Sequence, residues 1–391
     1  MSCRPGRAGA RPRGYAGPDA PGHVPVPPGG RRPAPRAGRH TGRRVLTVQS
    51  PPPRSRALLT GAAALVLATS LAACSGGDGR GDVAKGAETT NSPAAAGAAS
   101  GTPGTPAAPA DGKVAMPTGP ATTFTKARDT TVGPITMTTL TGAKSGVSGK
   151  VWVWLPPEYN DPKYAKTGFP VIILYSGGQS AGYNTYTDNQ LPIQAADVEM
   201  TKAGKAHPFI MIMPVQNLDS DEHKALECSD IPGQPKMGTW MAEDVPAFVR
   251  ANFRTLKSRD GWGLMGASTG AFCSAKLALQ HPETFKVAVP VDGYWAPDSP
   301  LWKGHETERQ ANSPNAMVSQ GKADVRMLAT AAGGTPPEVK LVKDWVAKAA
   351  PPLKIDYYEQ PGGQHLTSDF KKMIPNTLEW LTHNMAGPTA D

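Results

Sequence analysis

The most specific local pattern of the chain lies in residues 263–282, which read "GLMGASTGAFCSAKLALQHP". A short apolar run leads into Gly266-Ala-Ser268-Thr-Gly270, and residues of good helix propensity follow without a proline until the end of the stretch. This pattern predicts a strand, a sharp turn with Ser268 at its tip, and a helix. Such an elbow exposes a serine nucleophile above the carboxyl edge of a sheet. Glycines flank the serine because a Cβ there would collide with neighbouring backbone.

The same G-x-S-x-G pattern occurs at Gly178-Gln-Ser180-Ala-Gly182. A polar loop that ends in a proline follows it, so no helix is expected and Ser180 is not predicted to be a nucleophile. Attack on an ester carbonyl places negative charge on oxygen, which backbone N–H groups must receive. The predicted donors are Thr269, which follows the nucleophile, and Gly178, which follows an apolar strand. A plain tight turn is the alternative interpretation of Gly178.

Strands and helices alternate on both sides of the elbow. Continuous apolar runs predict strands that are covered on both faces, and alternating patterns predict half-buried antiparallel strands. Alternation of this kind predicts the α/β class, with a mostly parallel central sheet and helices on both faces, in one domain over about 122–386. The expected strands are 134–142, 150–159, 170–176, 208–215, 261–268 (which includes the elbow), 286–293, 324–331 and 353–360. The expected helices are 239–255, 269–282, 338–349 and 368–385, and an irregular insert is expected over 294–323.

A general base for Ser268 is expected downstream of it. His365 follows a strand through the flexible "PGGQ" loop, from which an imidazole can reach over the edge of the sheet. The other candidates are less suitable because His281 is expected to cap the elbow helix, His305 lies in the insert and His383 lies late in the last helix.

The acidic partner of His365 is expected after the strand 324–331. The first carboxylate there is Glu338, which is our prediction, although an acid at this position also stabilises the N-terminus of a helix. Asp292 is the alternative, because it follows the preceding strand. Asp344 lies in the middle of a helix and is not favoured.

The formal net charge of +9 is confined to one end of the chain. Residues 1–56 hold twelve arginines and one aspartate, which leaves 29 of the 41 basic and 31 of the 32 acidic residues for the remainder. The remainder is therefore close to neutral, and a nucleic-acid partner is not expected.

The first 121 residues indicate export. Residues 1–50 are rich in Arg, Pro, Gly and Ala, and we interpret them as a disordered arm or as an upstream extension from a start site assigned too early. Residues 51–74 have the pattern of a signal peptide that ends in a lipobox-like "LAAC", which predicts a lipid on Cys74. An ordinary secretory signal cut near Ala73 is the alternative. Residues 75–121 are predicted to be a Gly/Ala/Pro/Ser/Thr-rich tether. The protein is therefore expected to be attached to the outer face of a bacterial cytoplasmic membrane by this lipid alone, or to be secreted.

Cys228 and Cys273 are the two cysteines of the expected domain. In an exported protein two such cysteines indicate a disulfide, and two independent buried thiols are the alternative.

Several segments together resemble the putative-esterase family, which includes esterase D (S-formylglutathione hydrolase) and the mycolyltransferases of the antigen 85 complex. The resemblance covers about Val132 to Leu381. The segments are "VWVWLPPEY", "VIILYSGG", "WMAEDVPAFVRANFRT", "GLMGASTGAFCSAKLALQHPETF" and "PGGQH". The resemblance implies an α/β-hydrolase fold, a Ser-acid-His triad, no metal or cofactor, and a disulfide between cysteines at these two places.

Two positions depart from that family. Ser176 stands where members commonly carry His or Asp, and "HLTSDF" follows His365 in place of an aromatic, sugar-contacting stretch. Transfer to trehalose is therefore not expected. The predicted function is an exported serine esterase or acyltransferase that forms an acyl-enzyme on Ser268 and acts on small-molecule or lipid acyl esters. The alternative is a weakly active or inactive hydrolase-fold binding protein at the cell surface.

Overall fold

Six of the nine strands of the main sheet run parallel. The computed structural model describes residues 113–178, 181–333 and 336–391. The strand order is β12-β11-β10-β9-β6-β7-β4-β3-β2, in which β12 to β7 run parallel and the last three pair antiparallel at one edge. The bounds are β2 Thr125–Thr130, β3 Gly133–Thr141, β4 Ser148–Trp154, β6 Val171–Tyr175, β7 Ile210–Pro214, β9 Trp262–Ala267, β10 Val287–Val291, β11 Arg326–Ala331 and β12 Lys354–Glu359.

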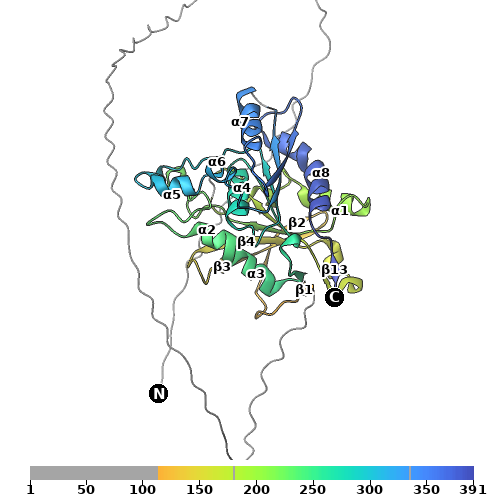
Figure 1. Cartoon of the computed structure of the whole chain (residues 1–391). Helices are drawn as coiled ribbons and strands as arrows, with labels where there is room; N and C mark the ends of the chain where they lie inside the picture. Colours follow the sequence, from red (N-terminus) through yellow and green to blue (C-terminus); the bar gives the residue numbers. More distant parts are fainter. Residues whose placement is uncertain (1–112, 179–180, 334–335) are drawn as a thin grey trace, which may run out of the picture. The chain divides into compact units, whose positions relative to one another are not determined.

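Helices lie on both faces of the sheet (Figure 1). The helix α4 packs against β6, β9 and β10, whereas α8 packs against α1 and also contacts β10 and β11. The helices are α1 Ile193–Lys202, α2 Met237–Thr239, α3 Val245–Asn252, α4 Thr269–Gln280, α5 Glu306–Ala311, α6 Pro314–Met317, α7 Pro336–Val346 and α8 Thr367–Asn384. The predicted α/β class with a mostly parallel sheet is confirmed.

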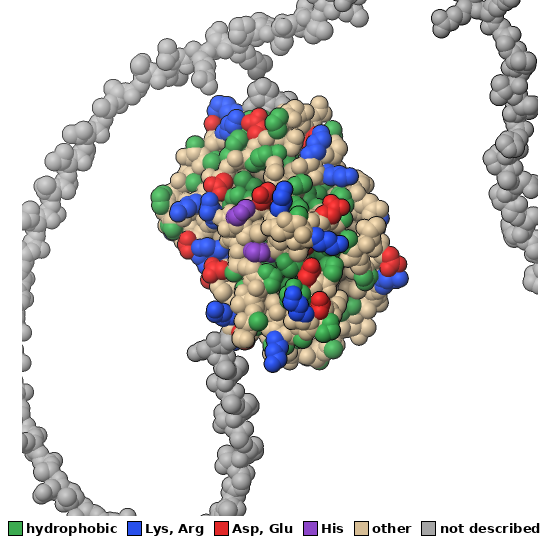
Figure 2. Space-filling model, turned by 90° about the vertical axis from the view of Figure 1, so that its right-hand side faces the viewer, with side chains coloured by type: hydrophobic (Ala, Val, Ile, Leu, Met, Phe, Trp, Pro, Cys, Tyr) green, Lys and Arg blue, Asp and Glu red, His purple; other side chains and the backbone are tan. Residues whose placement is uncertain are grey.

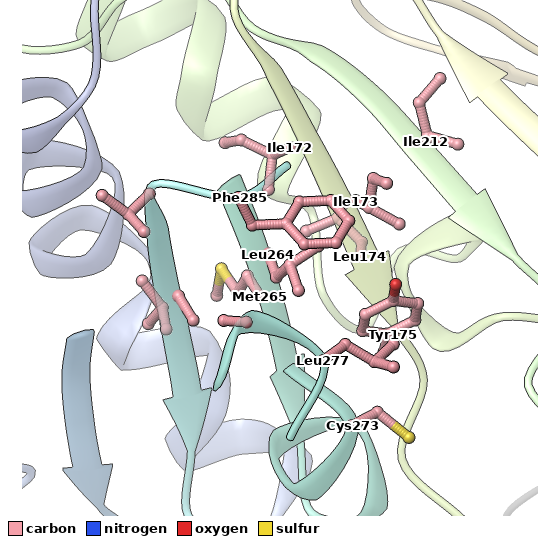
Figure 3. Close-up of a cluster of buried hydrophobic side chains, with 14 of the residues drawn as sticks. Ile172, Ile173, Leu174, Tyr175, Ile212, Leu264, Met265, Cys273, Leu277 and Phe285 are labelled. Carbon is pink, nitrogen blue, oxygen red and sulfur yellow. The ribbon is translucent and has the colours of Figure 1, made fainter. Parts of the chain in front are cut away.

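One part of the core lies between α4 and the central strands (Figure 3), and the core also includes buried residues of α1 and α8. Every residue of β6, β7, β9 and β10 is buried, as expected for continuous apolar runs in parallel strands. In the register of the sheet, Leu264 of β9 lies between Ile173 of β6 and Ala288 of β10. Strand β9, which directly precedes Ser268, is therefore buried between two other strands, and this packing fixes the position of Ser268.

Several predicted boundaries differ from the structure. The helix expected over 239–255 is divided into α2, a π-helical turn Trp240–Asp244 and α3. The insert 294–323 is not wholly irregular, because it contains α5 and α6. The folded part also exceeds 122–386, since β1 Val114–Ala115 pairs with β8 Thr255–Leu256 and β13 Thr389–Ala390 pairs with β5 Thr167–Gly168.

Most of the predicted N-terminal segments lie outside the described residues, including Cys74 and the predicted leader and signal peptide. In the part of the chain that is described, the helices are too short or too polar to cross a membrane. On the face drawn in Figure 2, acidic and basic side chains are interspersed.

A disulfide joins Cys228, in the loop after β7, to Cys273 in α4, with Cα atoms 5.8 Å apart. The predicted pairing is confirmed. One turn further along α4, the buried ammonium of Lys276 donates to the carbonyl oxygen of Cys228 and to Ser229 Oγ, the latter at 2.7 Å. Burial lowers the pKa of Lys276 to about 7. The loop is therefore attached to the elbow helix both covalently and by hydrogen bonds.

We expect the double variant Cys228→Ala/Cys273→Ala to be less stable by about 4 kcal/mol, because the bridge closes a 45-residue loop and restricts the unfolded chain. Turnover should fall as well, since the loop is attached to the helix that carries Ser268. Urea unfolding of the variant against the oxidised parent measures the first effect. Thiol titration of denatured, unreduced protein is the control: two free thiols from these positions would show that the bridge does not form.

Candidate active site

Ser268 lies at the tip of the turn between β9 and α4, with φ 57° and ψ −118°. A non-glycine residue in this region is strained, and such strain concentrates at functional sites. The backbone N–H of Ser268 donates to the carbonyl of Val291 at 2.9 Å. A Cβ on Gly266 would collide with the carbonyl of Gly270, and a Cβ on Gly270 with the carbonyl of Tyr175. The predicted elbow is therefore present, and its glycines are required by close backbone packing.

His365 reaches Ser268 from the loop between β12 and α8. Its Nε2 lies 3.0 Å from Ser268 Oγ, and its ring stands edge-on to Phe370 at 5.2 Å between centroids. The preceding Gly362 has φ 66°, a conformation that permits the sharp bend of this loop. The structure thus brings together the two residues that were predicted as nucleophile and base.

The carboxylate on the other side of the imidazole is Asp292, which directly follows β10. Its Oδ2 lies 2.7 Å from His365 Nδ1, and its Oδ1 accepts a hydrogen bond from the N–H of Ala332 at 3.0 Å. Asp292 has φ 53°, a second strained position, and its own N–H donates to the carbonyl of Thr330 at 3.0 Å. These contacts with the end of β11 hold the carboxylate toward the histidine.

The prediction that Glu338 is the acidic partner is therefore corrected in favour of the alternative, Asp292. Glu338 lies in the first turn of α7 and is exposed. It lines the same pocket as Ser268 and His365, but the hydrogen bond to the imidazole belongs to Asp292. The reason is local: Asp292 lies in a left-handed turn directly after β10, next to His365, whereas Glu338 lies on an exposed part of α7.

The partners of His365 determine its tautomer. A carboxylate only accepts hydrogen bonds, so Nδ1–H donates to Asp292 and Nε2 is free to accept from Ser268 Oγ–H. The hydrogen bond to Asp292 raises the pKa of His365, burial lowers it, and the charges of Asp292 and Glu338 raise it further, so that it lies above its usual value. The arrangement can take a proton from the serine and stabilise the resulting imidazolium.

Of the two predicted oxyanion donors, Thr269 directly follows the serine, and Gly178 follows Gly177, which lies against the serine. Thr269 is the first residue of α4, and the N-terminal amides of a helix have no partner within the helix. Gly177 and Gly178 follow β6; a Cβ on Gly177 would lie 3.4 Å from the Cβ of Ser268, and Gly178 has φ 73°. Backbone therefore approaches the nucleophile from two sides, and the donor roles of Thr269 and Gly178 stay predictions. Ser180, the rejected nucleophile, lies outside the described residues.

A pocket of about 270 Å³ opens above this group. Its lining also includes Tyr294, which stacks on Phe272 with centroids 5.0 Å apart and donates to Glu227 Oε1 at 3.1 Å. Glu227 is buried beside Cys228 and accepts further hydrogen bonds from the N–H groups of Asp298 and Ser299 and from Trp302 Nε1. Sequence reasoning missed this cluster, because about 70 residues separate its members and no local pattern joins them.

Among the described residues there is no group of three or more His, Cys, Asp or Glu side chains that could hold a metal ion.

Comparisons with known proteins agree with this geometry. The family described as "Putative esterase" matches residues 144–371. An uncharacterized protein of Corynebacterium glutamicum is 22% identical over 212 residues, which are 51% of this chain and 48% of that protein, so the chain spans about half the length of this curated relative.

Three solved structures share the fold at low identity. A ferulic acid esterase is 15% identical, with a TM-score of 0.54 over 64% of this chain and 98% of that one. An S-formylglutathione hydrolase from Agrobacterium tumefaciens is 13% identical, with a TM-score of 0.55 over 68% and 100%. A fluorophosphonate-binding serine hydrolase of Staphylococcus aureus is 17% identical, with a TM-score of 0.51 over 63% and 97%.

We expect Asp292→Asn to lower the pKa of His365, because the variant removes the acceptor that stabilises the imidazolium. Titration of the imidazole protons by NMR measures the shift, and Glu338→Gln should give a smaller decrease because Glu338 acts through its charge. The folded pKa lies above the unfolded one, so the contact stabilises the fold below the unfolded pKa and this contribution is lost as pH rises through the folded pKa. An unchanged histidine titration in Asp292→Asn would contradict this account.

Proposed function

Because the chain belongs to the putative esterase family, we propose that it is a serine hydrolase of carboxylic esters that acts through an acyl-enzyme on Ser268. The observation that carries the proposal is the continuous hydrogen-bonded series from Ser268 through His365 to Asp292, with separations of 3.0 and 2.7 Å. A nucleophile, a base and an orienting acid in this geometry can activate a serine hydroxyl near neutral pH.

The reaction proceeds in two halves. Ser268 Oγ attacks the ester carbonyl carbon while its proton moves to His365 Nε2, and Asp292 stabilises the imidazolium. The oxyanion lies toward the backbone N–H groups of Thr269 and Gly178. Collapse breaks the bond to the alcohol, which leaves with the proton of His365. Water then attacks the acyl-enzyme while His365 takes its proton; the bond between the acyl carbon and Ser268 Oγ breaks, His365 returns the proton to Oγ, and the carboxylic acid is released.

In this proposal water accepts the acyl group from Ser268. Transfer of the acyl group to a second alcohol would differ only in the second half-reaction, where the alcohol replaces water. The pocket above Ser268 is open and small, which supports short acyl groups rather than long chains enclosed in protein. A series of 4-nitrophenyl esters of increasing chain length, each with and without added sugar alcohols, distinguishes hydrolysis from transfer and ranks the acyl groups.

Ser268→Ala should lose at least about 10³-fold in kcat/KM toward 4-nitrophenyl acetate, since the nucleophile is removed. It should also lose covalent labelling by a fluorophosphonate. Ser180→Ala is the matched control, because it removes a serine from the second G-x-S-x-G pattern, and it should keep most activity and its labelling. Equal losses in both variants would contradict the proposal, and an unlabelled parent protein would favour a binding function instead.

We also propose that the mature protein begins at Cys74 with a lipid attached, so that the domain is tethered outside the membrane. The support is the signal-like pattern of residues 51–74 and the polar, Pro- and Gly-rich stretch that follows. Mass spectrometry of protein made in a lipoprotein-processing bacterium should give an acylated N-terminal Cys74. Cys74→Ala should shift the domain from the membrane fraction to the soluble fraction, and an unmodified N-terminus at another residue would refute the proposal.

A further inference from the structure

One wall of the pocket above Ser268 is formed by α7. Glu338 and Leu341 both line the pocket, and their spacing of three residues places them on the same side of the helix. Leu341 is 46% exposed, which leaves an apolar side chain in water at the mouth of the site. The wall is held in position from its other end, where Trp345 stacks on Trp295 with centroids 3.9 Å apart and an interplanar angle of 7°.

The acidic side chains of the pocket lining outnumber the basic ones. Its lining residues are Ser268, Asp292, Gly293, Tyr294, Glu338, Leu341 and His365, which include two carboxylates and neither lysine nor arginine.

The two carboxylates differ in what their charges do. Asp292 is hydrogen-bonded to His365, and its charge is matched by the imidazolium that forms during the reaction. Glu338 stands at the open side of the pocket, and its charge reaches the reacting groups, since it contributes to the raised pKa of His365. A substrate that enters the pocket therefore meets this charge and the exposed Leu341 together.

We propose that α7 sets the substrate class of the site: Glu338 disfavours esters that carry an anionic group, and Leu341 provides an apolar surface for uncharged ones. The inference rests on the proposed esterase function. A second negative charge a few ångströms from Glu338, in partly hydrated surroundings, should reduce kcat/KM about three- to tenfold, and added salt should weaken this effect.

Two pairs of substrates test the inference at both ends of the ester. For the acyl group, 4-nitrophenyl butyrate is compared with the mono-4-nitrophenyl ester of succinic acid. For the alcohol, 4-nitrophenyl acetate is compared with 3-carboxy-4-nitrophenyl acetate. The quantity measured is the ratio of kcat/KM for the neutral over the anionic member, because differences in intrinsic reactivity cancel when this ratio is compared between variants.

Glu338→Gln should lower this ratio about three- to tenfold in at least one pair, and Glu338→Lys should lower it further. The matched control is Asp344→Asn, which makes the same charge change on the same helix at a side chain that does not line the pocket. The control should leave the ratio at its parent value. The effect of Glu338→Gln should also shrink at 1 M salt.

The outcomes separate the two proposals. If hydrolysis depends on Ser268 but both ratios are the same in the parent, Glu338→Gln and Glu338→Lys, the inference about α7 is wrong and the esterase function stands. A decrease of the same size in Asp344→Asn would also overturn the inference, because the effect would then reflect net charge alone. If Ser268-dependent hydrolysis is absent, the proposed function and this inference fail together.

Discussion

The close approach of α4 to the ends of β6 and β9 is the contact on which the site depends. The backbone of Gly270 lies against the carbonyl of Tyr175, and Gly266 lies against Gly270, with no room for a Cβ at either glycine. Ser268 occupies the turn between these contacts in a strained conformation, and burial of the strands around it supplies the energy that maintains the strain. Helix α4 begins at Thr269, directly after Ser268, so the first turn of the helix lies next to the nucleophile.

A second strained residue, Asp292, lies at the end of the neighbouring strand β10. Strands β9 and β10 are parallel and paired along their length, up to Ala267 opposite Val291. Ser268 and Asp292 are the next residues, and both have positive φ. Because parallel strands end at the same edge of a sheet, two sharp turns at adjacent ends place a nucleophile and an acid within reach of one imidazole. The loop after β12 places His365 between these two side chains, where its imidazole contacts both.

The sequence was sufficient where the signal is local. Glycine spacing, the apolar run and the uninterrupted helix identified Ser268, and a flexible loop after a strand identified His365. The acid could not be chosen in this way, because Asp292 and Glu338 both follow strands and the choice depends on the conformation of single residues at the turns. The cluster around Glu227 could not be predicted from the sequence for another reason. Its hydrogen bonds to Tyr294 and Trp302 join distant parts of the chain, which only the fold brings together.

The two carboxylates of the pocket show how environment divides roles between identical chemical groups. The side chain of Asp292 is only 11% exposed and makes a direct hydrogen bond, so water competes little with its effect on His365. Glu338 is exposed, so solvent screening reduces the influence of its charge on the imidazole, and it lines the pocket that a ligand would enter. A buried carboxylate is thus suited to control a proton, and an exposed one at the mouth is suited to discriminate between substrates. Glu338 lies outside the hydrogen-bonded series of Ser268, His365 and Asp292 but in the lining of the same pocket, which is why we propose for it a role in substrate selection and none in proton transfer.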